Sequence, residues 1–346
     1  MAFTPDRVIN DKQIEWDKLR GSRILITGGT GLIGSVLART LLYANRVNST
    51  DIKITLVVRD TIKAKRIYGK RYSELTFIQQ DLMTEKIIEG SYDYIIHCAA
   101  ITSSSMMITS PVETIELSYR GTSALLKTAR QNNVKGMVYI SSMEVYGVTT
   151  EEMNPVTEDR LGIICLDNVR SSYQESKRLC ELLCTSYAEE YGVNVVSARL
   201  AQTFGAGVDK SDGRVFAQFA RSITEGRDIV LHTAGDSSGN YCDTADMASA
   251  VLILLTKGVR GQSYNVANEN NSCTVKEMAE LCAGTIAGGK IKVVYDIPED
   301  NSFGYAPVTR LRLSSARLRS LGWDPQYSLS DMYLSMIDHW NDPEDD

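Results

Sequence analysis

Three side chains in the middle of the chain have types and spacing that suit proton transfer at a hydroxyl group. Tyr173 and Lys177 stand at positions i and i+4 of a helix predicted over residues 171–191, so they share one face. A phenol has a pKa near ~10, and a neighbouring ammonium group favours the phenolate and lowers that pKa. Ser142 ends a predicted strand and can hydrogen-bond the same substrate hydroxyl. The pattern predicts a Ser–Tyr–Lys proton-transfer set; the alternative is an exposed helical pair without a role in catalysis.

A glycine turn near the start of the chain is the first element that must position this set. Residues 24–26 are an apolar run typical of a strand buried on both faces, and the pattern from residue 36 predicts a helix that begins near Gly31. A strand, a glycine turn and a helix N-terminus bind a dinucleotide, because its pyrophosphate lies against unpaired N–H groups. A side chain at Gly28 or Gly31 would hold the backbone away from the phosphates, and one at Gly34 would push the helix off the strand. The alternative is a purely structural turn. The turn residues expected to bind a cofactor are Gly28, Thr30, Gly31, Leu32, Ile33 and Gly34.

The end of the second predicted strand, residues 53–58, bears on the choice of dinucleotide. An acid at this place binds the ribose 2′-hydroxyl of NAD, whereas an arginine accommodates the 2′-phosphate of NADP. The sequence has Arg59 followed by Asp60, so both cofactors remain open. A redox-neutral cycle favours NAD slightly, and Arg59 leaves NADP possible. The alternative is a solvated pair in a turn.

Strands alternate with helices over the first 200 residues. Further strands are predicted at 75–79, 92–97, 136–141 and 193–200, with a helix at 111–132 and a loop at 148–169. This order predicts an α/β fold with a doubly wound parallel (Rossmann) sheet. After residue 205 the rhythm is less regular, with helices at 214–225, 244–256, 274–285, 314–321 and 329–340 and strands at 228–232, 263–266 and 291–295. We expect a dinucleotide-binding domain over 1–204, with a return segment near 240–267, interleaved with a smaller α/β substrate-binding lobe over 205–346.

Composition excludes several classes of function. The net charge of −6 and the lack of a long basic run argue against a nucleic-acid partner. The N-terminus lacks the apolar core of a signal peptide, and the longest apolar run, residues 250–255, is too short to span a bilayer. The 7 cysteines are scattered without a Cys-x-x-Cys pair, and the chain has only 3 histidines. We therefore expect no disulfide framework, no metal site, no membrane partner and a cytoplasmic location.

Several motifs occur in an order that is similar to one known family. They are Thr27-Gly-Gly-Thr-Gly-Leu-Ile-Gly34, Asp81-Leu82, His97-Cys-Ala-Ala100, Ser141-Ser-Met-Glu-Val-Tyr-Gly147 and Tyr173-Gln-Glu-Ser-Lys177. Over about residues 20–340 the chain resembles the extended short-chain dehydrogenase/reductases of the NAD-dependent nucleotide-sugar epimerase/dehydratase family. The resemblance implies a two-lobed enzyme that holds NAD or NADP in the first lobe. A nucleoside diphosphate sugar would bind between the lobes and react through transient oxidation at C4.

The resemblance also implies roles for individual residues. Ser142, Tyr173 and Lys177 match the catalytic set, and Glu144 matches a glutamate of dehydratases and decarboxylases, where a carboxylate removes the C5 proton of the 4-keto sugar. The alternative is that Glu144 pairs with a surface charge. Further cofactor contacts are expected from Arg59, Asp81, Leu82, Ala99, Ala100, Tyr173 and Lys177. Substrate contacts are expected from Thr102, Ser142 and Gln202.

Several positions depart from the family pattern. Met143 replaces an aspartate that protonates the departing C6 hydroxyl in deoxysugar dehydratases, which weakens a dehydratase interpretation. Ser118 and Gln202 each replace an asparagine, and Gly239 replaces an arginine that often binds the diphosphate of the sugar nucleotide. The arginines that we consider as substitutes are Arg214, Arg310 and Arg312.

Three alternatives therefore stay open beside a dehydratase or decarboxylase: a C4 epimerase, an NADPH-dependent keto-sugar reductase, and an NAD(P)-binding scaffold or sensor. Retention of Ser142, Tyr173 and Lys177 argues against the scaffold, which does not need them. Relatives pair through the helices predicted here at 112–132 and 171–191. Leu179, Leu182 and Leu183 give the second helix more apolar residues than one buried face requires, so we expect a homodimer.

Overall fold

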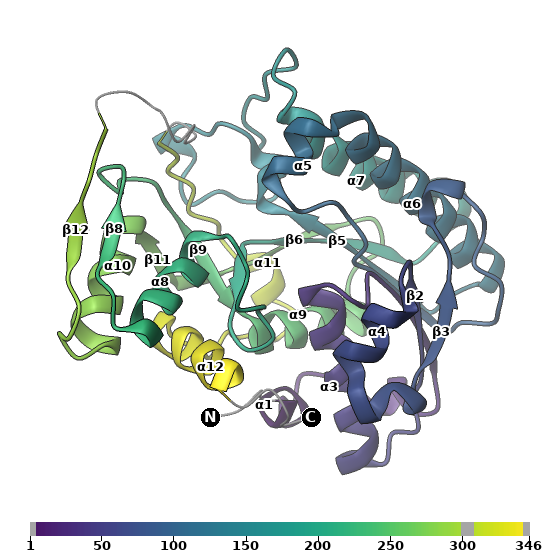
Figure 1. Ribbon diagram of the computed structural model, residues 1–346. Coiled ribbons are helices and arrows are strands. Elements are labelled where there is room, and N and C mark those ends of the chain that lie inside the picture. Colours follow the sequence, from purple (N-terminus) through teal and green to yellow (C-terminus); the bar gives the residue numbers. More distant parts are fainter. Residues whose placement is uncertain (1–4, 299–307, 342–346) are drawn as a thin grey trace.

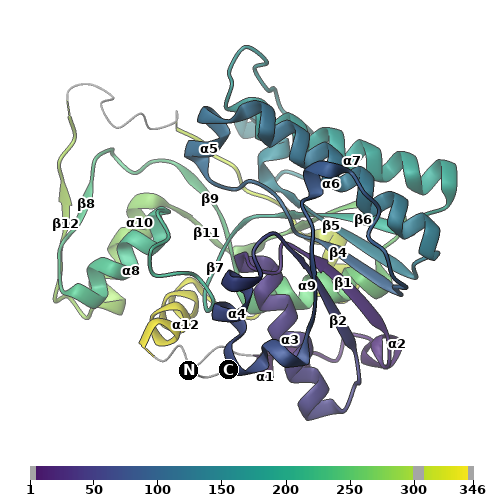
Figure 2. The same ribbon diagram turned by 45° about the vertical axis from the view of Figure 1, so that its right-hand side comes forward.

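A parallel sheet of seven strands forms the centre of the computed structural model, which describes residues 5–298 and 308–341. The strand order is β10-β6-β5-β4-β1-β2-β3 (Figures 1 and 2). The chain runs outward from β1 to β3, returns to β4 beside β1, and then runs outward on the other side. This order confirms the predicted doubly wound sheet. The strands are β1 (Arg23–Thr27), β2 (Lys53–Val58), β3 (Thr76–Gln79), β4 (Tyr94–His97), β5 (Gly136–Ser142), β6 (Val195–Leu200) and β10 (Ser263–Val266).

Helices cover both faces of this sheet. Successive side chains of a strand point to opposite faces, so each strand contributes to two cores. Ile24 and Ile26 of β1 pack on one face, in a core shared with α3 (Leu32–Asn48) and α9 (Thr244–Lys257). Leu25 packs on the other face, in a core shared with α6 (Pro111–Asn132) and α7 (Ser171–Tyr191). Figure 2 shows these helix layers on either side of the sheet. The short apolar run predicted from the sequence is therefore a strand buried on both faces.

The rest of the chain forms smaller sheets beside the large one, on the left of Figure 1. Three strands pair in the order β11-β9-β7, and β12 pairs with β8. Phe204, Phe216, Met278 and Met332 belong to the apolar cluster that packs these elements together. The strands are β7 (Gln202–Phe204), β8 (Ile229–Leu231), β9 (Ser238–Asp243), β11 (Asn268–Thr274) and β12 (Val293–Tyr295). The helices are α8 (Val215–Glu225), α10 (Val275–Leu281), η5 (Cys282–Ile286) and α12 (Leu329–Asn341). By contrast, α11 (Ala316–Arg319) packs through Leu318 into the core of the large sheet.

Two elements from residues 240–267 belong to the large sheet and its cover: α9 packs on one face and β10 forms an edge next to β6. The chain thus returns to the large sheet where the sequence predicts a return segment. The domain boundary at residue 204 stays a prediction. No helix within the described ranges is both long and apolar enough to cross a lipid bilayer.

The structure also contains elements that the sequence pattern did not predict. β7, β9 and β11 are rich in polar residues, so they lack the apolar alternation that identifies a strand. The predicted helix at 274–285 ends as α10 at Leu281 and continues as the π-helical turn η5. The other unpredicted elements are α1 (Pro5–Ile9), α2 (Trp16–Leu19), α4 (Thr61–Tyr68), α5 (Ser104–Thr109), η1 (Gly69–Glu74), η2 (Leu82–Thr84), η3 (Met143–Tyr146) and η4 (Glu151–Met153).

Candidate active site

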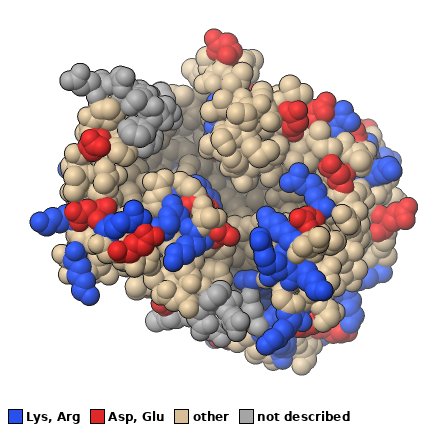
Figure 3. All heavy atoms as spheres, viewed as in Figure 1, with Lys and Arg blue, Asp and Glu red and all other residues tan. Residues whose placement is uncertain are grey.

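A cavity of about 540 Å³ lies at the carboxyl ends of the central strands, next to the start of α8. Ligands of open α/β sheets bind at this edge, where the strand order reverses. The space-filling view shows the surface hollowed between the two parts of the molecule (Figure 3). The predicted site residues that line the cavity are Gly28, Thr30, Gly31, Leu32, Ile33, Gly34, Arg59, Leu82, Ala99, Ala100, Thr102, Ser142, Glu144, Tyr173, Lys177 and Gln202.

The glycine turn places a helix N-terminus against this cavity. Gly28 has a φ of +69°, and a Cβ there would lie 2.9 Å from the backbone nitrogen of Ala99. A Cβ on Gly34 would lie 2.4 Å from the carbonyl oxygen of Gly28, so this glycine lets the helix pack on the turn. Gly31 is the N-cap of α3, and the first N–H groups of a helix have no intrahelical partner. The residues present therefore fit a dinucleotide pyrophosphate.

A buried chain of polar side chains fixes the turn against β4. The hydroxyl of Thr27 accepts a hydrogen bond from the backbone N–H of Ala99 at 3.2 Å and lies 2.7 Å from His97 Nδ1. His97 Nε2 lies 3.2 Å from the hydroxyl of Thr122 on α6. Burial lowers the pKa of His97 to about 3, so its ring is neutral. Both ring nitrogens of His97 are paired when Thr27 donates to Nδ1 and Nε2 donates to Thr122.

The proton-transfer residues lie at the inner end of the cavity. Tyr173 is 7% exposed and Lys177 is 3% exposed. The ammonium group of Lys177 donates to the carbonyl oxygen of Ile140 at 2.7 Å and lies 5.7 Å from the ring centroid of Tyr173. Ser142 accepts a hydrogen bond from the N–H of Glu144 at 3.2 Å, which leaves its own hydrogen available for donation. The structure therefore brings together the set that the sequence predicted, in a buried position.

The electrostatics of Tyr173 differ from the sequence prediction. Burial raises the pKa of Tyr173 to about 12, and the Glu144 carboxylate adds to this rise, while a hydrogen bond with Ser142 acts in the opposite direction. Burial also lowers the pKa of Lys177. In the protein alone the pKa of Tyr173 is therefore raised rather than lowered, because loss of water around the phenol outweighs the hydrogen bond with Ser142 and the positive charges of Arg170 and Arg214.

Glu144 pairs with a charge inside the site. Arg170 Nη2 donates to Glu144 Oε1 at 2.9 Å, and both side chains are 27% exposed. The guanidinium group of Arg170 also lies 5.9 Å from the ring centroid of Tyr173. The pair therefore joins the carboxylate to the N-terminus of the helix that carries Tyr173 and Lys177.

Some candidate residues lie elsewhere. Asp81 is absent from the cavity wall, because its carboxylate caps η2 by accepting from the N–H of Met83 at 2.9 Å. Arg310 is exposed and Arg312 pairs with Glu151, and neither lines the cavity. Of the three arginines considered, Arg214 alone is a lining residue.

The cavity wall contains further side chains that sequence reasoning did not select. Gln80 and Cys98 follow β3 and β4 directly. Ligands bind at the carboxyl ends of such strands, so a position just after a predicted strand was enough to select both residues as candidates. Lys63 lies on α4, a helix that the apolar pattern did not reveal. Met107 and Phe216 belong to none of the motifs and are brought to the wall by tertiary packing.

A second buried network supports the strands beneath the catalytic residues. Arg199 of β6 forms a pair with Glu181, one helical turn after Lys177, and its Nη2 lies 2.7 Å from Glu181 Oε2. Ser141, next to Ser142, donates to Glu181 Oε1 at 2.5 Å. Arg199 Nη1 donates to the backbone carbonyl of Glu158 at 3.0 Å. The network therefore links β5, β6 and α7.

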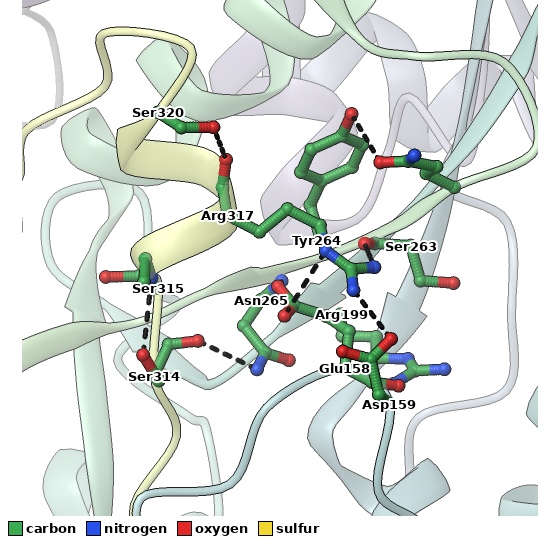
Figure 4. Close-up of polar contacts among 12 residues, drawn as sticks. Glu158, Asp159, Arg199, Ser263, Tyr264, Asn265, Ser314, Ser315, Arg317 and Ser320 are labelled. Atoms are coloured by element: carbon green, nitrogen blue, oxygen red, sulfur yellow. Dashed lines mark hydrogen bonds and ion pairs between the residues drawn. The ribbon is translucent and has the colours of Figure 1, made fainter.

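The same network extends to the C-terminal part of the chain (Figure 4). Asn265 of β10 donates its backbone N–H to Glu158 Oε1 at 2.8 Å and a side-chain N–H to the carbonyl of Ser314 at 2.9 Å. Arg317 of α11 contacts Asp159 at 2.7 Å and Glu158 at 3.7 Å. Segments far apart in sequence are thus held to the edge of the large sheet.

Replacing Gly31 by valine is expected to abolish dinucleotide binding while the protein stays folded. The nearest atom to a Cβ at Gly31 is the Gly28 carbonyl at 3.4 Å, which is ordinary contact, so the fold can accept a side chain. The same side chain would project into the cavity and hold the phosphates away from the helix N-terminus. Isothermal calorimetry with NAD⁺ and NADP⁺ and a thermal unfolding scan measure the two effects. Gly284→Ala is the control, because its Cβ meets open space; unchanged cofactor affinity in Gly31→Val would contradict the assignment.

Comparison with known proteins relates the chain to one family. The sequence model of the NAD dependent epimerase/dehydratase family matches residues 24–267. UDP-glucuronic acid decarboxylase 3 of Arabidopsis thaliana is 30% identical over 308 residues, which cover 89% of this chain and 85% of the relative. Human dTDP-D-glucose 4,6-dehydratase is 25% identical over 318 residues, covering 88% and 85%. The crystal structure of UDP-glucose 4-epimerase from Thermotoga maritima superposes with a TM-score of 0.76 at 21% identity, covering 93% and 99%.

Proposed function

The chain belongs to the NAD dependent epimerase/dehydratase family, and we propose that it converts a nucleoside diphosphate sugar through transient oxidation at C4. One observation carries the proposal: Ser142, Glu144, Tyr173 and Lys177 line the same cavity as the glycine turn. When bound, NAD(P) supplies the group that accepts a hydride from C4 and later returns it. The protein's own residues must then bind the sugar and move its protons.

Tyr173 is the proposed base for the sugar's 4-hydroxyl. Its phenolate accepts the hydroxyl proton as the hydride leaves C4, and Ser142 donates a hydrogen bond to the same oxygen. The ammonium group of Lys177, held by the Ile140 carbonyl, stabilises the negative charge on the phenolate. Burial excludes water from this group and strengthens each of these interactions.

Glu144 is the proposed base for the second step. Once C4 is a ketone, the proton on C5 is acidic, and a carboxylate beside it can remove or return that proton. Arg170 holds Glu144 in place. Met143, which also lines the cavity, has no proton to give a departing C6 hydroxyl. This favours decarboxylation of a sugar with a C6 carboxylate over dehydration. In that step the C5–C6 bond breaks, CO₂ leaves and its electron pair forms a C4–C5 enolate, so Glu144 delivers a proton taken up from solvent to C5 rather than removing one. The relative named as a UDP-glucuronic acid decarboxylase supports this choice.

Arg214 is the proposed contact for the diphosphate of the sugar nucleotide. Gly239 supplies no cation in β9, whereas Arg214 lines the cavity at the start of α8. Its guanidinium group pairs with Asp212 at 2.6 Å and lies 4.7 Å from the Phe216 ring centroid, so it is oriented before substrate binds. A planar guanidinium suits bidentate binding of phosphate oxygens.

Mass spectrometry of products tests the proposed function. The purified protein is incubated with NAD⁺ or NADP⁺ and a panel of nucleoside diphosphate hexoses and hexuronic acids. We expect a product that has lost CO₂. Loss of water indicates a dehydratase, and unchanged mass with altered chromatography indicates an epimerase. A gain of two hydrogens by a nucleoside diphosphate 4-keto sugar in the presence of NADPH indicates a reductase. Cofactor binding without turnover of any sugar would favour the scaffold or sensor instead.

A homodimer is the expected assembly, formed through α6 and α7. These adjacent helices expose apolar side chains on their outer surface, and Val112 and Leu182 are each 63% exposed. Leu183 instead packs against the core of the large sheet. The exposed set is Val112, Ile115, Tyr119, Leu179 and Leu182. Exposed apolar side chains gathered on two neighbouring helices are typical of a protein–protein interface.

Light scattering at micromolar concentration measures the assembly. We expect a dimer mass for the wild type and a monomer mass for the double variant Val112→Glu with Leu182→Glu, because two buried charges would face their copies. Leu334→Glu on α12 is a matched control, since Leu334 is 48% exposed and lies outside this surface. A monomeric wild type would rule the dimer out.

A cytoplasmic location is the remaining part of the proposal. All 7 cysteines are free thiols in the structure, and 4 of them are buried. Free, scattered cysteines are typical of proteins in a reducing compartment.

A further inference from the structure

The end of the cavity beside β2 is lined by cations. Arg59 is the first residue after β2, and Gln79 donates to its carbonyl oxygen at 3.1 Å, which fixes the backbone at this point. Lys63 lies in the first turn of α4. Both side chains are exposed and line the cavity. Two cations are therefore available where a dinucleotide bound across the glycine turn places its adenine ribose.

Asp60, the acid next to Arg59, caps a helix and does not line the cavity. Asp60 is the N-cap of α4, and its Oδ1 accepts hydrogen bonds from the N–H groups of Ile62 and Lys63 at 2.8 and 2.9 Å. Asp60 is not among the residues that line the cavity. An acid that recognises NAD must accept from the ribose hydroxyls at the tip of β2. In this chain the residue at that tip is Arg59, and the acid that follows it holds a helix end.

The wider surroundings add positive charge. The space-filling view shows Lys and Arg gathered over α4 at the rim of the hollow (Figure 3). Arg66 lies on α4 with Lys63, and the positive charges of both help to lower the pKa of Asp209. Hydrogen bonds from Ser211 to the Asp209 carboxylate are the main reason that the pKa of Asp209 is lowered. This acid is therefore satisfied within its own turn.

We propose that this chain selects the 2′-phosphorylated dinucleotide, NADP(H), and that Arg59 and Lys63 bind the 2′-phosphate. A phosphate monoester carries roughly two negative charges at neutral pH, whereas the 2′-hydroxyl of NAD carries none. Arg59 offers two parallel N–H donors to the phosphate oxygens, and Lys63 adds a point charge. The inference rests on the proposed function, because it concerns the cofactor site of that function. The family's description names NAD, so a preference for NADP(H) distinguishes this chain from that description.

Calorimetric titration of the protein with NADP⁺ and with NAD⁺ tests the inference without any substrate. We expect NADP⁺ to bind at least about tenfold more tightly than NAD⁺. The reason is that hydrogen bonds from Arg59 and Lys63 to the 2′-phosphate join charged groups, and such bonds are stronger than those between neutral groups. Arg59→Ala should weaken NADP⁺ binding by about 10- to 100-fold and leave NAD⁺ binding within about twofold. Lys63→Ala should act in the same direction, and added salt should weaken NADP⁺ binding more than NAD⁺ binding. Lys65→Ala is the matched control, because Lys65 lies on α4 away from the cavity wall.

The outcomes separate this inference from the proposed function. NAD⁺ binding as tight as NADP⁺ binding, or equal weakening of both by Arg59→Ala, would overturn the selectivity and leave the proposed function standing. Failure of both dinucleotides to bind would overturn both. Arg59→Asp gives a positive check, since an acid at the tip of β2 should reverse the order of the two affinities.

Discussion

Replacing Tyr173 by phenylalanine is expected to slow the first hydride transfer by about 10²- to 10⁴-fold, the usual effect of removing a positioned general base. Phenylalanine keeps the ring in its buried place, so the fold should be retained. Without the phenol, the sugar's 4-hydroxyl keeps its proton and C4 cannot release a hydride. Stopped-flow absorbance of reduced nicotinamide measures this step directly, once a substrate has been identified.

Glu144→Gln is the matched variant, because its proposed role begins only after C4 is oxidised. The Glu144 carboxylate contributes to the raised pKa of Tyr173, so its loss should not slow the first step. We expect reduced nicotinamide to appear and then persist, with release of a 4-keto sugar. If Glu144→Gln turns over like the wild type, the C5-base role is wrong and an epimerase or reductase becomes the better interpretation.

The first step should also depend on pH in a defined direction. The pKa of Tyr173 is raised to about 12 by burial, and only the phenolate accepts a proton. The phenolate fraction increases as the pH rises toward that pKa, so the rate of hydride transfer should increase from neutral to alkaline pH. Tyr173→Phe should lose this dependence.

Replacing Glu181 by glutamine is expected to lower the free energy of unfolding by about 3–5 kcal/mol, the usual cost of removing one partner from a buried ion pair. The side chains of Arg199 and Glu181 are 7% and 9% exposed. Burial alone would lower the pKa of Arg199, but hydrogen bonds from Arg199 to the Glu181 carboxylate raise it above its ordinary value. An arginine side chain is effectively always protonated, so the guanidinium stays charged in the variant and loses its neutralising partner. Urea denaturation at a fixed protein concentration measures the change.

An exposed pair provides the control for this stability prediction. Glu151 lies 3.2 Å from Arg312, and their side chains are 65% and 53% exposed. Glu151→Gln should change stability by less than about 1 kcal/mol, because water screens such pairs. An equally small loss of stability in Glu181→Gln would contradict the prediction. It would mean that two other groups are sufficient to stabilise the Arg199 guanidinium: the carbonyl of Glu158 and the hydroxyl of Tyr146, each 3.0 Å from Nη1.

The sequence by itself determined the parts of the site that depend on local pattern. The run before Gly28 is apolar, as is typical of a strand buried on both faces, and the glycines that follow permit the tight turn into α3. Tyr173 and Lys177 share a helix face through their spacing alone. Parallel strands present their carboxyl ends at one edge of a sheet, so the position of Ser142 at the end of β5 is enough to predict that it lies near that turn.

Only the tertiary structure decided how neighbouring candidates divide their tasks. Arg59 and Asp60 are adjacent in sequence, yet one lines the cavity while the other caps α4, a helix that the apolar pattern does not reveal. Arg214 lies in the cavity wall, whereas Arg310 and Arg312 do not, because the packing of α8 and of the C-terminal segment separates them. The physical reason is that spacing fixes which face of an element a residue occupies, whereas burial, partners and pKa depend on what other elements bring to that face.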